Sequence, residues 1–170
     1  MSQTKLIVLR GPSASGKSTA SKMLFNKAAR RTVLIEQDHY RFMFKPAGGG
    51  TKPNSTTIHK MIKSNTLFAL KDGYDVILEG ILSVKAYGQV LEDIFTEHPE
   101  ENYIFYFDTS LEETLKRHTK KNIEPLEFGE PELRKWYPTS FPSGHKLEQV
   151  IPETFTPKET VEFIEKTSKL

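Results

Sequence analysis

Eight residues near the start of the chain have the types and spacing that bind a phosphate group. The segment from Gly11 to Ser18 reads Gly-Pro-Ser-Ala-Ser-Gly-Lys-Ser and matches the pattern G-x-x-x-x-G-K-[ST]. Glycines at both ends allow the backbone to turn its N–H groups inward around phosphate oxygens. In such a loop Lys17 reaches the β- and γ-phosphates, and the Ser18 hydroxyl binds magnesium. The pattern predicts a site for a nucleoside triphosphate and its Mg²⁺ ion.

The elements on either side of this loop are those that phosphate binding requires. The apolar run Leu6–Leu9 precedes it and is typical of a buried parallel strand. After it, Ala20, Met23, Leu24 and Ala28 recur at helical spacing. The positive N-terminus of that helix would point at the same phosphate oxygens. We expect the following loop residues to contact the nucleotide: Gly11, Pro12, Ser13, Ala14, Ser15, Gly16, Lys17, Ser18 and Thr19.

A second polar group follows the next apolar segment, where Glu36 to Arg41 reads Glu-Gln-Asp-His-Tyr-Arg. Ligands of doubly wound sheets bind at the carboxyl ends of the strands, where these residues would lie. Asp38 could there accept the proton of an acceptor hydroxyl that attacks the γ-phosphate. Arg41 could hold the acceptor or its anionic group. The alternative is that Asp38 only caps a helix over residues 39–44.

The coarse pattern along the chain alternates short apolar strands with amphipathic helices. Ser110 with Glu113, and Thr156 with Glu159, have the spacing of capping boxes at helix starts. The expected strands are 6–9, 32–35, 76–78, 103–107 and a weak fifth at 150–151; helices are expected over 20–28, 58–69, 87–95, 110–115 and from 156 onward. This order predicts an α/β fold: a doubly wound, five-stranded parallel sheet with helices on both faces.

Composition narrows the class of protein. The chain has 170 residues, which favours a single domain over 1–170. Lys plus Arg number 24 and Asp plus Glu 22, a balance unlike that of proteins that coat nucleic acid. There is no cysteine, so disulfides and Cys-ligated zinc are excluded. Residues 1–5 do not begin a signal peptide and no apolar run approaches about 18 residues. We expect a cytoplasmic protein without membrane contact.

Two classes of phosphate-loop protein are disfavoured. GTPases usually read guanine through Asn-Lys-x-Asp, but here Asn26-Lys27 is followed by two alanines inside the first helix. The chain is short for an AAA-type motor with its usual lid domain, and no clear Asp-Glu pair follows an apolar strand.

The sequence resembles small P-loop kinases, whose fold is that of the nucleoside-monophosphate-kinase-like P-loop NTPases. These include polynucleotide 5′-hydroxyl kinase, gluconate kinase and chloramphenicol phosphotransferase. The phosphate loop, the pair Asp38-x-x-Arg41 and the strand end Leu78-Glu79-Gly80 carry the resemblance, together with the segment around Arg117. The chain is most similar to bacterial proteins known only as predicted kinases. It shares with them Leu78-Glu79-Gly80-Ile81-Leu82, Phe128-Gly129-Glu130, Arg134-Lys135-Trp136-Tyr137 and Val150-Ile151-Pro152.

The resemblance implies roles for further residues. Asp38 would be the general base and Arg41 an acceptor-side group, while Glu79 would hold Mg²⁺ through water or fix the acceptor. Glu79 could instead only orient a neighbouring loop. Arg117 resembles the first arginine of a short helical lid at about 117–140, which would close over the triphosphate.

The second lid arginine of that pattern has no arginine at the matching position. Lys121 stands in its place, and lysine lacks the bidentate fork of arginine, so Arg134 could supply the contact. Trp136, Tyr137 and Phe141 could line an aromatic acceptor pocket, although we favour their packing of the lid onto the core. His39, beside Asp38, could line the same pocket.

These features lead to one leading hypothesis. The chain would be an ATP- and Mg²⁺-dependent kinase in which Lys17 and Arg117 offset phosphate charge and Asp38 activates an alcohol group of a small molecule, such as a nucleoside, sugar or antibiotic. One alternative is a polynucleotide 5′-hydroxyl kinase, which the charge balance makes less favoured. Another is an ATP-binding regulatory protein without kinase chemistry. Both a monomer and a homodimer are compatible with the sequence.

Overall fold

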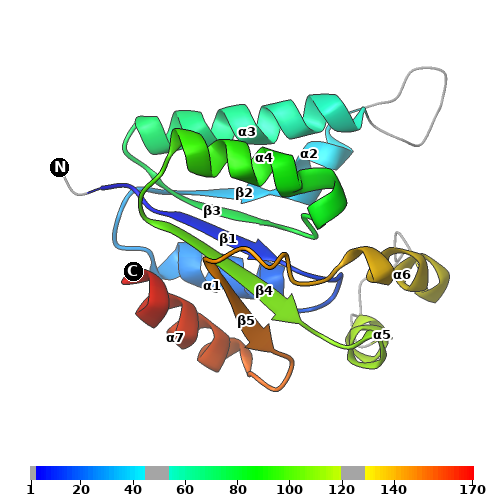
Figure 1. The fold of residues 1–170 in the computed structure, drawn as a ribbon. Coiled ribbons are helices and arrows are strands. Elements are labelled where there is room, and N and C mark those ends of the chain that lie inside the picture. The colour runs from blue at the N-terminus through cyan, green and yellow to red at the C-terminus, as the bar shows by residue number, and fades with distance from the viewer. Residues whose placement is uncertain (1–2, 45–53, 120–128) are drawn as a thin grey trace.

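The protein contains a five-stranded, fully parallel β-sheet, seen here in a computed structural model (Figure 1). The structure describes residues 3–44, 54–119 and 129–170, apart from the side chain of residue 138. The strand order is β2-β3-β1-β4-β5. The strands are β1 Leu6–Arg10, β2 Thr32–Glu36, β3 Asp75–Gly80, β4 Asn102–Asp108 and β5 Glu148–Pro152. All five predicted strands are confirmed, each within one or two residues of its expected ends.

Helices cover both faces of this sheet, as predicted (Figure 1). On one face lie α3 (Ser55–Lys71) and α4 (Val84–Glu97); on the other lie α1 (Lys17–Lys27) and α7 (Pro157–Ser168). Each face has its own apolar core. Because side chains alternate along a strand, Leu6 and Val8 of β1 pack toward α3 and α4, whereas Ile7 and Leu9 pack toward α1 and α7.

Shorter helices lie beyond the carboxyl ends of the strands (Figure 1). The helix α2 (Gln37–Phe42) follows β2 directly, and α5 (Leu111–Thr119) follows β4. The helix α6 (Glu130–Trp136) continues into a short 3₁₀ helix, η2 (Tyr137–Thr139). The expected lid at 117–140 spans residues 120–128, which lie outside the described residues, so that lid stays a prediction.

The two predicted capping boxes have different outcomes. At Thr156 both halves form, because its hydroxyl accepts from the Glu159 amide and the Glu159 carboxylate accepts from the Thr156 amide. At Ser110 only the hydroxyl half forms. The Glu113 carboxylate pairs with Arg117 instead, and the Ser110 amide donates to Glu153 at 2.8 Å. The predicted capping box at Ser110 is therefore confirmed only in part. Glu113 pairs with Arg117, and the Ser110 amide takes Glu153 as its acceptor in place of Glu113.

Among the residues that the structure describes, none of the helices combines the length and apolar character needed to span a membrane.

Candidate active site

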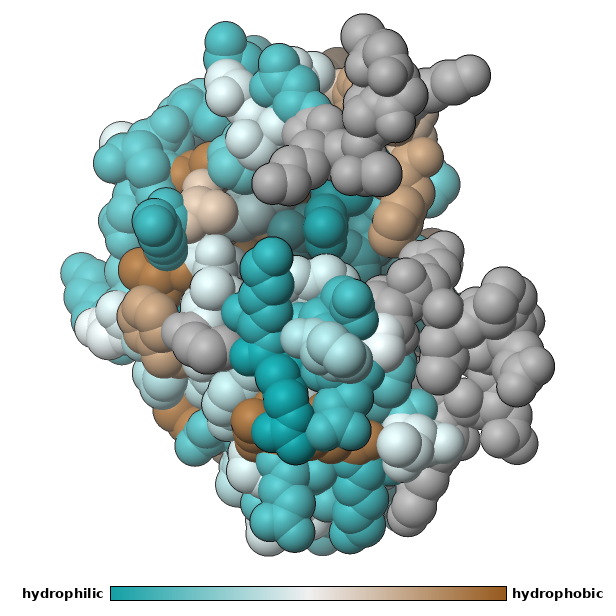
Figure 2. Space-filling model, turned by 90° about the vertical axis from the view of Figure 1, so that its right-hand side faces the viewer, coloured by the Kyte–Doolittle hydropathy of each residue, from teal (hydrophilic) through white to brown (hydrophobic). Residues whose placement is uncertain are grey.

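The strand register brings three predicted site segments to one edge of the sheet. Glu79, near the end of β3, lies opposite Leu9 of β1 on one side and Glu36 of β2 on the other. The phosphate loop, which follows β1, therefore begins on one side of Glu79, and α2, which follows β2, begins on the other side. Figure 2 looks onto this edge, whose described surface is mainly hydrophilic and is hollowed near its centre. Such an edge is where ligands of open parallel sheets bind.

The two glycines of the phosphate loop are needed for different reasons. Gly11 has φ +146°, and a Cβ there would lie 2.8 Å from the Phe107 carbonyl oxygen on β4. Gly16 has φ +105° at the start of α1, with open space where a Cβ would point. Gly11 thus allows a close approach of two backbones, whereas Gly16 only allows the backbone angle.

Lys17 and Ser18 make hydrogen bonds within the phosphate loop and to the neighbouring strand β3. The buried Lys17 ammonium donates to the Pro12 carbonyl at 2.5 Å and to the Ser15 hydroxyl at 3.1 Å. The Ser18 hydroxyl donates to the Glu79 carboxylate at 3.1 Å. Burial raises the pKa of Glu79, while the charge of Lys17 and the Ser18 hydrogen bond partly oppose that shift.

Oxygen ligands at this position suit Mg²⁺. A serine hydroxyl and a carboxylate are hard oxygen donors, and Mg²⁺ in such sites keeps several waters and binds substrate phosphates. The part of the chain that the structure describes contains no cluster of three or more His, Asp or Glu that could hold a metal alone. Ser18 and Glu79 therefore fit a magnesium ion that arrives with a nucleotide.

A cavity of about 350 Å³ lies over the phosphate loop. The loop side is formed by residues that the motif predicted, whereas the opposite wall was missed by sequence reasoning. That wall consists of Phe107, Phe155, Pro157 and Thr160. Phe155 comes from the segment between β5 and α7, and Pro157 is the first residue of α7; both lie far from the motif in the sequence. The only sequence signal for it is its position after the fifth strand, at the same sheet edge.

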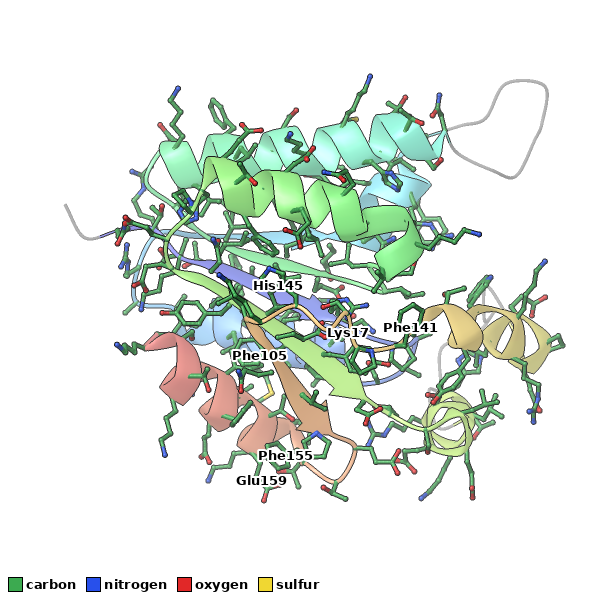
Figure 3. The ribbon with its side chains drawn as sticks, viewed as in Figure 1. Lys17, Phe105, Phe141, His145, Phe155 and Glu159 are labelled. Atoms are coloured by element: carbon green, nitrogen blue, oxygen red, sulfur yellow. The ribbon has the colours of Figure 1, made fainter. Side chains whose placement is uncertain are left out.

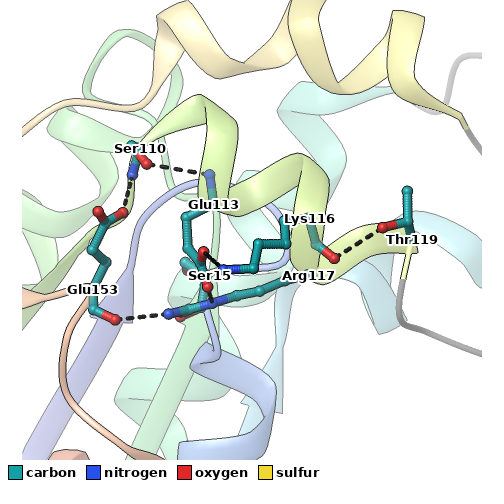
Figure 4. Close-up of polar contacts among 7 residues, drawn as sticks. All are labelled: Ser15, Ser110, Glu113, Lys116, Arg117, Thr119 and Glu153. Atoms are coloured by element: carbon teal, nitrogen blue, oxygen red, sulfur yellow. Dashed lines mark hydrogen bonds and ion pairs between the residues drawn. The ribbon is translucent and has the colours of Figure 1, made fainter.

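Arg117 lies at the rim of this cavity and joins three segments (Figure 4). Its guanidinium donates to Glu113 of its own helix at 2.8 Å, to the Ser15 carbonyl of the phosphate loop at 3.1 Å and to the Glu153 carbonyl at 2.8 Å. The Arg117 hydrogen bond lowers the pKa of Glu113. The guanidinium is thus held beside the phosphate loop, as its predicted role requires.

Asp38 and Arg41 lie at the predicted edge but are exposed. They form an ion pair at 3.1 Å, with side chains 62% and 38% exposed. Asp38 is the second residue of α2, and the residue that precedes the helix, Glu36, makes no side-chain capping bond. The capping alternative is therefore not what the structure shows. After burial, the charge of Asp38 is among the causes that raise the pKa of Glu79, so the two carboxylates lie within electrostatic range.

Of the two candidates for a second lid arginine, the structure describes only Arg134. Arg134 is exposed and pairs with Glu130 on its own helix at 2.7 Å, and it is absent from the lining of the cavity. Lys121 lies outside the described residues. Of the aromatic residues, Tyr137 donates its hydroxyl to the Thr109 carbonyl at 3.0 Å, and Phe141 is exposed. The Tyr137 contact ties η2 to the end of β4, in line with a packing role.

Sequence reasoning also missed the buried Gln37. Its side-chain oxygen accepts from the Leu82 amide at 3.1 Å, and a Cβ on Gly80 would overlap it. Gln37 therefore connects the start of α2 with the loop after β3. The signal was present in the sequence as a polar residue directly before Asp38, but its partner is 45 residues away.

Residues 6–136 match the AAA domain family, which covers most of the chain. The chain belongs to this family. The P-loop core is therefore of the AAA kind. A search of curated proteins finds no significant match.

Solved structures show the same P-loop fold. Gluconokinase from Sinorhizobium meliloti 1021 superposes with a TM-score of 0.69 at 15% identity, covering 99% of this chain and 94% of its own. The APS kinase CysC of Mycobacterium tuberculosis, solved with AMPPNP and APS, gives 0.71 at 12% identity over 100% of both chains. A chain of the Pnkp1/Rnl/Hen1 RNA repair complex gives 0.62 at 22% identity, covering 82% of this chain but only 44% of its own.

Proposed function

We propose that this protein is an ATP- and Mg²⁺-dependent kinase that transfers the γ-phosphate to a hydroxyl group of a small molecule. The observation that carries the proposal is that Lys17 and Ser18 line the phosphate-loop cavity, that Glu79 accepts a hydrogen bond from Ser18, and that Asp38 lies at the same sheet edge. The first three residues supply the charge and oxygen ligands that a triphosphate needs. Asp38 supplies a base where an acceptor would enter.

The roles follow from charge and position. The Asp38 carboxylate takes the hydroxyl proton as the acceptor oxygen forms a bond to the γ-phosphorus, and the bond to the β-phosphate oxygen breaks to release ADP. Lys17 and Arg117 offset the negative charge on the transferring group. Bound Mg²⁺ would neutralise phosphate charge, and Ser18 would ligate it with Glu79 acting through water.

The contacts that Lys17 and Asp38 now make are compatible with this chemistry. Lys17 donates to oxygens of its own loop, and phosphate oxygens can replace these acceptors. The Asp38–Arg41 pair is solvent-exposed, and such pairs contribute only about 0–1 kcal/mol. An acceptor can therefore separate the pair, taking its hydroxyl to Asp38 and an anionic or polar group to Arg41.

The wall of the cavity that sequence reasoning missed offers a surface for the base of a nucleotide. Phe107, Phe155 and Pro157 present apolar surface next to the phosphate loop, and ligand pockets combine such surface with a few polar groups. A base could pack there while its phosphates lie on the loop.

A metabolite-panel screen tests the proposal. Pools of hydroxyl-bearing metabolites are incubated with the protein, Mg²⁺ and γ-labelled ATP, and products are identified by mass. We expect one class of compound to gain a phosphate group, in step with ADP release. ATP binding without transfer to any pool would instead favour a regulatory nucleotide-binding protein.

A polynucleotide 5′-hydroxyl kinase is the second candidate. It is favoured by the spacing of Asp38 and Arg41 and by the similarity to a chain of the RNA repair complex. Transfer of labelled phosphate to a 5′-hydroxyl oligonucleotide, weakening steeply as salt rises, would support it. Absence of such transfer under conditions where a metabolite is phosphorylated would eliminate it.

A further inference from the structure

Arg10 is a buried charged residue that immediately precedes the phosphate loop. Its side chain is 1% exposed and pairs with Glu148 of β5, 3% exposed, at 2.6 Å. Buried ion pairs contribute little net stability, because removing two charges from water costs about as much as their attraction returns. The best-attested use of such groups is to fix the relative position of the elements that they join.

The Arg10 guanidinium joins two further segments through main-chain atoms. It donates to the Leu82 carbonyl at 3.2 Å and to the Phe141 carbonyl at 2.9 Å, and it lies 5.1 Å from the centre of the Tyr106 ring. Figure 3 labels Phe141 and His145 on the segment that crosses the sheet between α6 and β5. The same Glu148 carboxylate accepts from an amide of this segment at Ser143.

A cavity makes these polar contacts more important for the crossing segment. About 350 Å³ of space separates α4 from residues 143–145, with Arg10 and Leu82 in its wall. Beside that space the segment still contacts α4 through His145, whose ring lies 5.3 Å from that of Phe95 and whose Nε2 lies 3.7 Å from the Glu92 carboxylate. Arg10 and Glu148 hold the same segment through the Phe141 carbonyl and the Ser143 amide.

Leu82 connects Arg10 with α2 through hydrogen bonds of its main chain. It is fully buried and has φ +41°, a left-handed conformation that a leucine adopts only when its surroundings enforce it. Its carbonyl accepts from Arg10 and its amide donates to Gln37 at 3.1 Å. Gln37 also hydrogen-bonds Tyr87 of α4. A short buried chain of hydrogen bonds therefore runs from Arg10 through Leu82 to Gln37.

This chain joins the two halves of the active site beyond the ends of the strands. The pairing of β1 with β3 ends at Arg10 and Gly80, and the pairing of β2 with β3 ends at Glu36 and Glu79. Strand pairing therefore does not hold the residues that follow these pairs. In the sequence, Arg10 immediately precedes Gly11 of the phosphate loop, and Gln37 immediately precedes Asp38. We propose that Arg10 is a positioning residue that, through Leu82 and Gln37, fixes Asp38 relative to the phosphate loop. The proposal rests on the kinase function proposed above.

Two variants each break one end of this chain of hydrogen bonds. Arg10→Lys keeps a positive charge for Glu148 but loses the planar fork that reaches both carbonyls. Gln37→Leu removes the acceptor of the Leu82 amide without touching the ion pair. Val8→Ala is the matched control, because Val8 lies on the same strand and face and is fully buried, but contacts neither carbonyl.

Phosphate transfer from γ-labelled ATP to the metabolite pools gives the first readout. We expect both variants to lower the transfer rate at saturating ATP about tenfold, as loss of orienting contacts commonly does. The KM for ATP should stay within about twofold, and the double variant should be no slower than the slower single variant, since both act through one chain. Val8→Ala, at a temperature that matches its stability, should transfer at the wild-type rate.

Hydrogen exchange gives a readout that needs no acceptor. Peptides covering 80–84 and 37–42 should exchange about tenfold faster in Arg10→Lys and Gln37→Leu than in Val8→Ala, while protection of the phosphate loop by Mg²⁺·ATP is retained. Exchange equal to that of Val8→Ala, or a loss of ATP affinity instead of transfer rate, would overturn the proposal. If the wild type phosphorylates nothing, the kinase function fails, and the exchange result alone decides whether Arg10 positions α2.

Discussion

Lys17 and Asp38 follow β1 and β2, the two strands that flank β3, yet their surroundings are opposite. Lys17 is 6% exposed and hydrogen-bonds within its own loop, whereas the Asp38 side chain is 62% exposed and pairs only with Arg41 among the contacts found in the described residues. The proposed nucleotide side thus has a buried charge held by its own loop, whereas the proposed acceptor side offers charged groups on an open helix. Variants on each side should therefore fail in different ways.

The largest effect is expected on the nucleotide side. Lys17→Ala should lower phosphate transfer by at least about 10³-fold, because it removes a buried charge that stabilises the transferring phosphate. Initial rates with γ-labelled ATP measure this. Lys22→Ala, on the same helix but with its side chain 62% exposed, should transfer normally. Equal rates for the two variants would contradict the assignment of Lys17.

Asp38→Asn should separate binding from chemistry. Because asparagine cannot accept the hydroxyl proton, transfer should fall about 10²–10³-fold. ATP affinity should change little, since Asp38 is not part of the cavity wall. Calorimetric titration with ATP and single-turnover rates measure the two effects. The matched control is Asp72→Asn, exposed and outside the site. If Asp38→Asn loses ATP binding instead, the division into two sides is wrong.

Two glycine-to-alanine variants should change the free energy of unfolding in opposite directions. Gly11→Ala should cost about 1–3 kcal/mol in the free energy of unfolding, because its Cβ would meet the Phe107 carbonyl oxygen and its φ is positive. Gly88→Ala should raise that free energy by up to about 1 kcal/mol, since Gly88 lies within α4 and its nearest neighbour would be 3.7 Å away. Urea unfolding of both variants measures the difference, and the same sign for both would count against this account.

Glu79→Gln should change how stability depends on pH. Burial raises the pKa of Glu79 in the folded protein above its ordinary value of 4.5. The stability that the protonated Glu79 carboxyl contributes is therefore fully present below pH 4.5. It is lost as the pH rises through the pKa that Glu79 has in the folded protein. Glutamine does not titrate, so the melting temperature of the variant relative to wild type should be higher at pH 7.5 than at pH 4. A difference that falls or stays constant with pH would contradict this.

The local features of the site could be predicted from the sequence because each depends on neighbours in the chain. The phosphate loop, the strand before it and the helix after it are contiguous, so a motif of eight residues was enough for Lys17 and Ser18. The parallel sheet also followed from the alternation of apolar runs and amphipathic segments. The strand register then places Glu79 of β3 opposite Leu9 of β1, beside the start of the loop.

The remaining features depend on contacts between distant residues. Arg10 finds partners 72, 131 and 138 residues away, and Phe155 reaches the cavity only because β5 pairs with β4. The type of Arg134 suits a phosphate contact, but the sequence could not show that Glu130, one turn away, pairs with it in an exposed ion pair. Its contact with phosphate stays a prediction.

The close approach of Gly11 to β4 has a consequence for reading related sequences. A side chain at this position would collide with the Phe107 main chain whether or not a nucleotide ever binds. A related protein with this fold would therefore need glycine at this position even if it bound no nucleotide. A glycine conserved here would indicate that the fold is kept, and would not by itself indicate that a phosphate is bound.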